Sequence, residues 1–280
     1  MSEPVLEPTA RRRRRGHPVA PSRAVRRYQD GRFVERIETI AGECATALVY
    51  NGDSFAVMMT TPEHLEDFAV GFTLAEGIVA DAQEISAITV EDVVLGVEIR
   101  LTIPARRMDA LLDRRRNVTA GTSCGMCGIL SIERALRALP ALPPSPSIPG
   151  SVVQQALAAL PEHQAVNHQT GAAHAAAFAD RDGRVVLLRE DVGRHNALDK
   201  LTGAMARAGL LAADGFLLLT SRCSTEMVQK AALAGFPVVV AISAPTTLAV
   251  ELADAAGLTL IGFARPSGFN VYTHEQRITL

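Results

Sequence analysis

Apolar runs of strand length alternate with segments of helical periodicity in the second half of the chain. The runs at 215–221, 237–243 and 258–264 are short and bounded by turn residues, which is typical of buried strands. The segments between them, 224–235 and 245–257, repeat apolar residues at helical spacing. Strands joined by helices require right-handed crossovers, so the strands run parallel with helices on both faces. This pattern predicts an α/β fold with a mainly parallel sheet.

The polar residues that follow these strands are expected to meet at one edge of the sheet. Binding sites in such sheets lie beyond the carboxyl ends of the strands. The segments after Ser221, Ser243 and Ala264 each follow a predicted strand. We therefore expect them to lie together and to form the site of this domain.

The chain divides into four parts by composition and periodicity. The first part is an Arg-rich arm, and the second is a small α+β domain with a hairpin around Asn51-Gly52-Asp53 and a helix that starts at Pro62. A C-x-x-C loop, a helix and a Pro-rich connector follow, and the α/β domain comes last, with paired strands before a helix at 194–209. The predicted boundaries are 1–32, 33–116, 117–150 and 151–280.

The N-terminal arm carries most of the positive charge. Residues 1–32 hold nine arginines against Glu3, Glu7 and Asp30, a net charge of +6, so the remainder sums to −8. The run Arg11–Arg15 lies among Pro, Ser and Ala without an apolar period, which predicts a disordered arm of undefined role. No apolar stretch follows the arginines, and no run of about 18 apolar residues occurs, which favours a cytoplasmic protein without a membrane partner.

Two of the four cysteines, Cys124 and Cys127, form a C-x-x-C pair among glycines. Zinc binding, dithiol redox cycling and sulfur carriage all use this spacing. A structural zinc site needs a second pair of ligands, and the histidines at 163, 168 and 174 match no standard spacing. A thioredoxin-like motif follows a strand, whereas arginines 114–116 precede this pair. Those arginines would lower a thiol pKa, so sulfur carriage fits best, and an inert pair stays open.

Longer motifs in the same order resemble one family. They are "EDVGRHNALDK" at 190–200, "SRCSTEMVQK" at 221–230, "ISAPTTLAVELA" at 242–253 and "GLTLIGFARPSGFNVYTH" at 257–274, together with "CGMCG" at 124–128. These segments resemble the FdhD/NarQ family, the formate dehydrogenase accessory sulfurtransferases. The resemblance runs from about residue 33 to the C-terminus and does not include the arginine arm.

The resemblance implies a fold and an activity. Family members accept sulfur from a cysteine desulfurase as a cysteine persulfide and pass it to the bis-guanine-dinucleotide form of the molybdenum cofactor, which enters formate dehydrogenase. Cys124 matches the usual persulfide carrier, and Cys127 matches the second loop cysteine. The implied fold is a cytidine-deaminase-like, three-layer α/β domain with a smaller α+β domain, assembled as a homodimer, with no metal site and no nucleic-acid partner. The stretch assigned to cofactor binding corresponds to Phe263, Ala264, Arg265, Pro266, Ser267 and Gly268.

A large anion with pyrophosphates and guanine heads gives the remaining polar residues a role, and GDP would mimic it. Arginine forks and lysine point charges suit phosphate, and residues at helix starts bring backbone N–H groups to it. The candidates are Arg194, Arg222, Arg265, Lys200, Lys230, Ser221, Ser224 and Thr246, with Asp191 or Glu226 as acceptors for a guanine edge.

Plainer roles remain open for several of these residues. The two lysines would be solvated late-helix residues, Ser224 an N-cap and His195 a core histidine. Cys44 and Cys223 are expected to be buried thiols. An alternative function from a different class is a chaperone that holds the cofactor for insertion without transferring sulfur.

Overall fold

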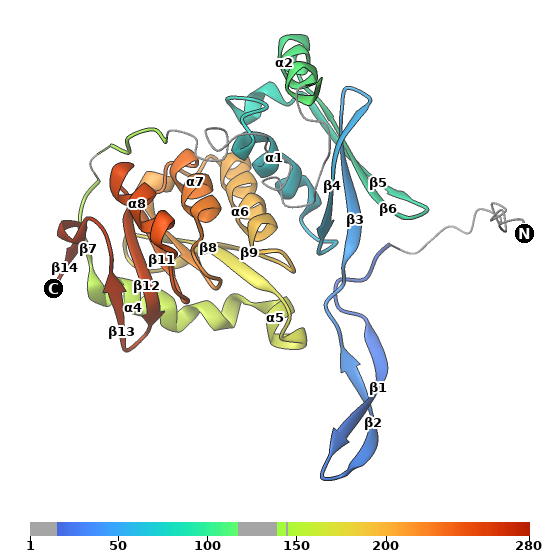
Figure 1. Cartoon of the computed structure of the whole chain (residues 1–280), viewed down its shortest axis with the longest axis horizontal. Coiled ribbons are helices and arrows are strands. Elements are labelled where there is room, and N and C mark those ends of the chain that lie inside the picture. The colour runs from blue at the N-terminus through green and yellow to red at the C-terminus, as the bar shows by residue number, and fades with distance from the viewer. Residues whose placement is uncertain (1–15, 117–138, 144) are drawn as a thin grey trace, which may run out of the picture.

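A computed structural model of the chain describes residues 16–116, 139–143 and 145–280 (Figure 1). Cys124, Cys127 and the Arg11–Arg15 run lie outside the described residues, so the predictions for them stay predictions.

A six-stranded sheet forms the larger part of the molecule, in the order β13-β12-β11-β10-β8-β9. Its strands are β8 (His174–Asp180), β9 (Val185–Asp191), β10 (Gly215–Leu219), β11 (Val238–Ala241), β12 (Thr259–Arg265) and β13 (Gly268–Val271). The predicted α/β class is confirmed. The sheet is mixed and not mainly parallel, because only β10, β11 and β12 pair in parallel. The short turns before β9 and β13 force antiparallel pairs, as expected for hairpin connections.

Helices cover both faces of this sheet (Figure 1). One face carries α6 (Arg194–Ala208), α7 (Thr225–Leu233) and α8 (Thr247–Ala255), and the other carries α4 (Gly150–Ala159) and α5 (Ala165–Thr170). Leu217 and Leu219 belong to the buried cluster beneath α6–α8, whereas Leu218 belongs to the cluster beneath α4. This alternation follows from the two-residue period of a strand and gives a three-layer arrangement. A short parallel pair, β7 (Ile148–Pro149) with β14 (Ile278–Thr279), adjoins α4.

A second, four-stranded sheet in the order β4-β3-β6-β5 has its own buried core. Its elements are β3 (Cys44–Tyr50), β4 (Asp53–Thr60), β5 (Ala87–Val93) and β6 (Gly96–Thr102), with the helices α1 (Leu65–Ala75) and α2 (Ala105–Arg116). The predicted hairpin turn is present: Asn51 and Gly52 both have positive φ, which the Asn-Gly pair tolerates.

The two sheets are joined where α1 packs against α6. Gly71 and Gly203 lie at the crossing, and a Cβ atom at either would fall within 2 Å of a carbonyl oxygen of the facing helix. Glycine is therefore required for this close approach. Asp67 of α1, whose side chain is buried, accepts hydrogen bonds from Arg189 Nε (2.8 Å) and Arg207 Nη1 (2.5 Å).

An antiparallel hairpin of β1 (Ser22–Gln29) and β2 (Arg32–Thr39) projects from the body (Figure 1). The sequence predicts a disordered arm over residues 1–32, whereas the structure places 22–29 in a strand. The reason is the turn at Asp30-Gly31, where both residues have positive φ, as a two-residue hairpin turn requires. Among the described residues, none of the helices combines the length and the hydropathy that a membrane span requires.

Candidate functional site

The segments after β10, β11 and β12 lie side by side at one edge of the large sheet. The Cys223 N–H donates to the Ala244 carbonyl (3.2 Å), and the Thr246 N–H donates to the Cys223 carbonyl (3.2 Å). The Phe263 N–H donates to the Ser243 carbonyl (3.1 Å). The expectation that these polar segments share one edge is confirmed.

Three helices begin at this edge, each after a strand that ends there. The residues that cap α6, α7 and α8 are Gly193, Ser224 and Thr246, and none makes a side-chain cap hydrogen bond. The first N–H groups of a helix have no partner within the helix and are usually satisfied by such a cap. Helix starts of this kind attract anions through those N–H groups and the helix dipole.

Buried polar atoms at the first turns of α6 and α7 also lack partners. Within the described residues and in the absence of water, Arg194 Nε and Ser224 Oγ are buried without a hydrogen bond. Buried polar groups are almost always satisfied in native proteins, so a ligand or ordered water is expected beside them. The N-cap role considered for Ser224 holds for its backbone position but not for its side chain.

His195 and Glu226 face each other across the first turns of α6 and α7. His195 Nε2 lies 2.5 Å from Glu226 Oε2, so the two side chains are direct partners. The hydrogen bond with His195 lowers the pKa of Glu226 against the opposing effect of burial, and the charges of His195 and Arg194 lower it further. A carboxylate that already faces His195 is a poorer acceptor for a guanine edge than the sequence suggested.

His174, at the start of β8, belongs to the same edge because it pairs with Asp191 at the end of β9. Burial lowers the pKa of His174, and the positive charge of Arg194 lowers it further. The ring is therefore held in its neutral form near neutral pH. No spacing pattern predicts His174 in this site, because it lies on β8, twenty residues before Arg194 at the start of α6.

The stretch from Phe263 to Gly268 forms the end of β12 and the turn into β13. Phe263 has φ 51°, and its side chain is 52% exposed, beside an irregularity in the strand pairing. Ala264 is buried, whereas Pro266 and Ser267 are exposed. Arg265 Nη1 donates to the carbonyls of Ile242 (2.6 Å) and Ala264 (2.7 Å). The backbone thus positions an exposed aromatic ring and an anchored guanidinium at the same edge.

Of the other candidates, Ser221 and Arg222 lie in the loop between β10 and α7. Ser221 is buried and its Oγ donates to the Arg222 carbonyl (2.9 Å), so this hydroxyl is already used. The Arg222 side chain is exposed. Contact of either residue with a cofactor stays a prediction.

Lys200 and Lys230 are engaged within the protein. Lys200 is fully buried, and its Nζ contacts Asp191 Oδ2 (2.7 Å) and the carbonyls of Thr61 and Glu190. Lys230 Nζ lies 2.6 Å from both oxygens of Asp199. Neither is a solvated late-helix residue, and Asp191 is too buried to read a guanine. In this arrangement both ammonium groups hold elements together, and their contact with a cofactor stays untested.

The described cysteines are poor nucleophiles. Cys44 and Cys223 are buried free thiols, as expected, and burial raises the pKa of Cys223 to about 12. In the part of the chain that the structure describes, no three metal-ligating side chains gather. His64 and Glu66 lie at the start of α1, where Glu66 pairs with Arg207.

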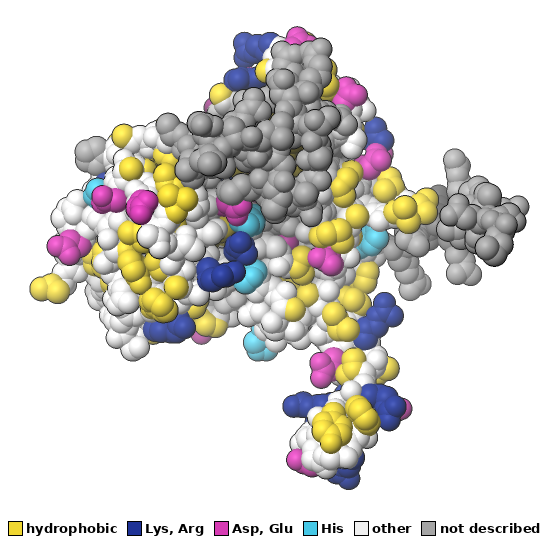
Figure 2. Space-filling view, viewed as in Figure 1, with side chains coloured by type: hydrophobic (Ala, Val, Ile, Leu, Met, Phe, Trp, Pro, Cys, Tyr) yellow, Lys and Arg dark blue, Asp and Glu magenta, His cyan; other side chains and the backbone are white. Residues whose placement is uncertain are grey.

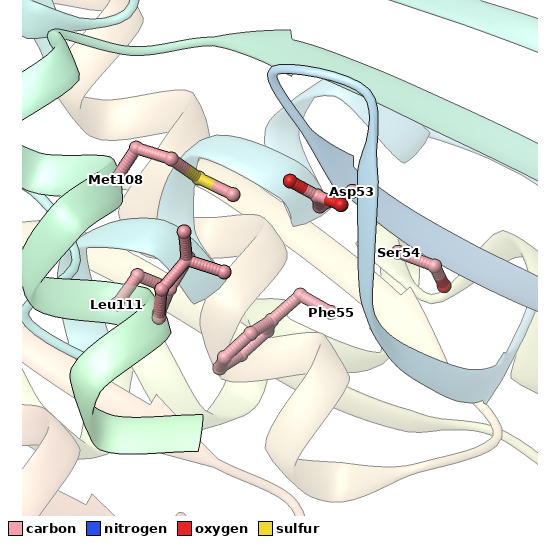
Figure 3. Close-up of a pocket in the computed structure, with 6 residues that line it drawn as sticks. Asp53, Ser54, Phe55, Met108 and Leu111 are labelled. Atoms are coloured by element: carbon pink, nitrogen blue, oxygen red, sulfur yellow. The ribbon is translucent and has the colours of Figure 1, made fainter. Parts of the chain in front are cut away.

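A pocket between α2 and the start of β4 is not a competing site (Figure 3). Met108 and Leu111 face Phe55 across it, with Asp53 at its side. It is a shallow hollow lined mainly by apolar side chains. An apolar hollow with one carboxylate also suits an anion poorly.

Comparisons with known proteins agree on one family. The sequence profile of the FdhD/NarQ family matches residues 41–279. A protein of Xanthomonas euvesicatoria pv. vesicatoria named "Sulfur carrier protein FdhD" is 52% identical over 276 residues, 99% of this chain and 97% of the relative. A protein of the same name from Cupriavidus necator is 44% identical over 261 residues, 93% of this chain and 91% of the relative.

A solved structure gives the same result for the fold. A protein of Desulfotalea psychrophila, described as a formate dehydrogenase accessory protein, superposes with a TM-score of 0.75 over 94% of this chain and 100% of its own. At 24% identity this likeness establishes a shared fold.

Proposed function

The chain belongs to the FdhD/NarQ family, and on this basis we propose that it carries sulfur to the molybdenum cofactor of a formate dehydrogenase. The sulfur comes from a cysteine desulfurase and travels as a persulfide on Cys124. The acceptor is the bis-guanine-dinucleotide form of the cofactor, which the protein binds as a substrate at the edge where α6, α7 and α8 begin. The names of the relatives support sulfur carriage and a role in formate dehydrogenase maturation.

One observation supports the location of the acceptor most directly: the two unsatisfied donors Arg194 Nε and Ser224 Oγ. A dinucleotide offers phosphate oxygens, which accept hydrogen bonds from such donors. The uncapped starts of α7 and α8 add backbone N–H groups to the same region. The donor set fits a polyanion better than an apolar or cationic ligand.

The exposed residues of the edge have complementary roles. Phe263 offers an aromatic face on which a guanine stacks, a contact of about 1–3 kcal/mol per base in nucleic-acid complexes. Arg222 and Arg265 direct guanidinium groups toward the phosphates, and the carbonyl of Ile242 fixes the position of Arg265. These residues bind and orient the acceptor.

The sulfur step uses the loop cysteine as a nucleophile. The Cys124 thiolate attacks the outer sulfur of the desulfurase persulfide, a new S–S bond forms on Cys124, and the desulfurase cysteine leaves as a thiolate. No net oxidation occurs, because one persulfide replaces another. The two described cysteines are unsuited to this step, since Cys44 and Cys223 are both buried. Cys127 assists in the handling of the sulfur.

Mass spectrometry after incubation with a desulfurase and cysteine tests the carrier step. We expect one added sulfur on the peptide 117–134, removable by a reductant and absent from Cys124→Ala. The same variant is expected to bind GDP normally and to fail to activate formate dehydrogenase. Full activation by a variant that lacks both loop cysteines would contradict sulfur transfer and favour the insertion chaperone.

Calorimetric titration with GDP tests the binding site separately. Arg194→Ala and Ser224→Ala are expected to weaken binding at least tenfold, because hydrogen bonds to charged groups contribute about 1.5–3 kcal/mol. Arg184→Ala is the matched control, since Arg184 is exposed. It precedes β9 and so lies at the far end of that strand from the site. If the unmodified protein and the three variants bind GDP with equal affinity, the acceptor does not bind at this edge.

A further inference from the structure

Two ion pairs connect α6 to α7 beside the proposed acceptor site. His195 of α6 meets Glu226 of α7, with Nε2 2.5 Å from Oε2. Lys230 Nζ of α7 lies 2.6 Å from both carboxylate oxygens of Asp199 of α6. The members of the two pairs are four residues apart on each helix, so they lie on one face of it, about one turn apart. The two helices are therefore joined at two successive turns, starting from their first residues.

The order of the charges along the two helices favours a single alignment. On α6 the histidine precedes the carboxylate, whereas on α7 the carboxylate precedes the ammonium group. Displacing α7 by one turn, about 5.4 Å, would place either Glu226 beside Asp199 or Lys230 beside His195. The first displacement brings two carboxylates together, and the second leaves Lys230 without a carboxylate, so both are unfavourable. The two pairs thus resist sliding of one helix along the other.

The Asp199–Lys230 pair is the more enclosed of the two. Its side chains are 2% and 16% exposed, whereas both side chains of the other pair are 21% exposed. From α1, Gly71 packs against the Asp199 carbonyl, and the Phe72 ring centre lies 5.9 Å from Lys230 Nζ. Burial raises the pKa of Asp199, and the charge of Lys230 opposes this effect. The buried carboxylate therefore depends on Lys230 for its compensation.

The unsatisfied donors of the proposed site belong to the turns that these pairs align. Arg194 directly precedes His195, and Ser224 lies two residues before Glu226. Figure 2 shows Lys or Arg side chains beside His side chains on the face of the molecule below α6 and α7, as Figure 1 labels them. One anion can accept from both Arg194 Nε and Ser224 Oγ only when their separation suits donor–acceptor distances of about 2.7–3.2 Å. That separation is set by the alignment of the two helices.

We propose that Asp199 and Lys230 are positioning residues for the acceptor site. Their ion pair holds α6 and α7 in the alignment that brings Arg194 and Ser224 to the same anion, and neither side chain contacts the ligand. This role differs from the direct phosphate contact that the sequence suggested for Lys230. The inference rests on the proposed function, because it concerns the same acceptor.

Calorimetric titration with GDP tests the role of the pair. Asp199→Leu/Lys230→Met replaces both charges by apolar side chains of similar volume, a change that often preserves the stability of a protein. We expect this double variant to bind GDP about tenfold or more weakly, because small displacements of binding groups are costly. Lys230→Arg retains a cation and is expected to stay within about threefold of the unmodified protein. Arg184→Ala is again the control, and urea unfolding of each variant separates lost alignment from lost folding.

Asp199→Asn distinguishes a positioning role from direct contact with the ligand. The substitution removes the carboxylate charge that holds Lys230 and leaves the lysine in place. A lysine that binds phosphate directly would then be freer to do so, and GDP affinity would stay equal or rise. A positioning role predicts weaker binding. Equal or tighter GDP binding by Asp199→Asn, or an unchanged affinity in the double variant, overturns the proposal.

His174 reports the alignment without any nucleotide. Burial and the charge of Arg194 lower its pKa. Loss of the Asp199–Lys230 pair leaves the net charge unchanged, so displacement of Arg194 is expected to raise the pKa of His174 in the double variant. Nuclear magnetic resonance titration of the nucleotide-free protein measures this shift, and an unchanged pKa overturns the positioning role. If the unmodified protein does not bind GDP, the acceptor site itself is wrong, whereas unimpaired binding without the pair overturns only the positioning role.

Discussion

Lys200 and Asp191 form an ion pair inside the protein, with Nζ 2.7 Å from Oδ2 and both side chains fully buried. The same carboxylate accepts hydrogen bonds from the Thr61 N–H (2.9 Å) and the Gly193 N–H (2.8 Å). The pair therefore connects the end of β9 and the start of α6 to the segment between β4 and α1. It also places the first turn of α6, with Arg194 and His195, against the small sheet.

Lys200→Met is expected to lower the free energy of unfolding by about 3–5 kcal/mol, because it leaves the Asp191 carboxylate buried without its cation. Urea unfolding measures the loss. Arg184→Met, which removes an exposed cation, is the control and is expected to stay within about 0.5 kcal/mol of the unmodified protein. A loss below about 1 kcal/mol for Lys200→Met would mean that the pair is not structural.

Gly203→Ala is expected to lower the free energy of unfolding by at least about 1–3 kcal/mol. Its Cβ atom would lie 1.9 Å from the Asp67 carbonyl, so α1 and α6 must separate. Gly150→Ala in α4 is the matched control, because its nearest neighbour would be 3.5 Å away. Chemical denaturation measures the change in the free energy of unfolding for each variant. The two changes should have opposite signs or clearly different sizes.

Acid stability is expected to depend on Glu84. Arg107 donates two hydrogen bonds to its carboxylate and lowers the pKa from 4.5 to about 2. Because the folded pKa lies below the unfolded one, this contribution is complete above pH 4.5 and is lost as the pH falls toward about 2. Unfolding free energies of Glu84→Gln and the unmodified protein should therefore converge as the pH falls through this range. A constant difference would contradict the pairing.

His174 provides a spectroscopic probe of the site. Its pKa lies below 6.5, mainly through burial and in part through Arg194. Arg194→Ala is expected to raise this pKa without restoring the ordinary value, and bound GDP is expected to raise it in the unmodified protein. Nuclear magnetic resonance titration of the ring measures both shifts. If the pKa of His174 does not change when GDP is added, the nucleotide binds away from this edge.

Cys223 is expected to resist alkylation in the folded protein, because its thiol is buried and its pKa is raised to about 12. Iodoacetamide labelling at neutral pH, followed by peptide mass spectrometry, should modify Cys223 only after a denaturant is added. Rapid labelling of the native protein would show that the loop before α7 opens.

Local patterns allowed much of the architecture to be predicted. Helix α6 ends at the expected Gly209, whose φ of 68° suits glycine, and the Asn51-Gly52 turn lies where the strand pattern required it. The position of Ser243 and Phe263 at one edge of the large sheet could be predicted from strand direction alone. These features depend on short-range chemistry, which a single sequence contains.

The roles of the two lysines depended on distant partners and were not predictable in this way. Lys200 meets the carbonyl of Thr61, 139 residues earlier in the chain, and Lys230 lies over the ring of Phe72 at 5.9 Å. Helical periodicity places such residues on a face but does not say what that face meets. The mixed direction of the large sheet is likewise not predictable from local pattern, because it depends on β8 lying between β9 and β10 and pairing antiparallel with both.

The charges on α1 also constrain how the protein is made. Asp67 leaves the ribosome 122 residues before Arg189 and 140 residues before Arg207, the two cations that satisfy it. During that interval the small sheet exists without the helix against which Gly71 must pack. The first half of the nascent chain therefore cannot complete its fold alone, and its final consolidation waits for α6 to emerge.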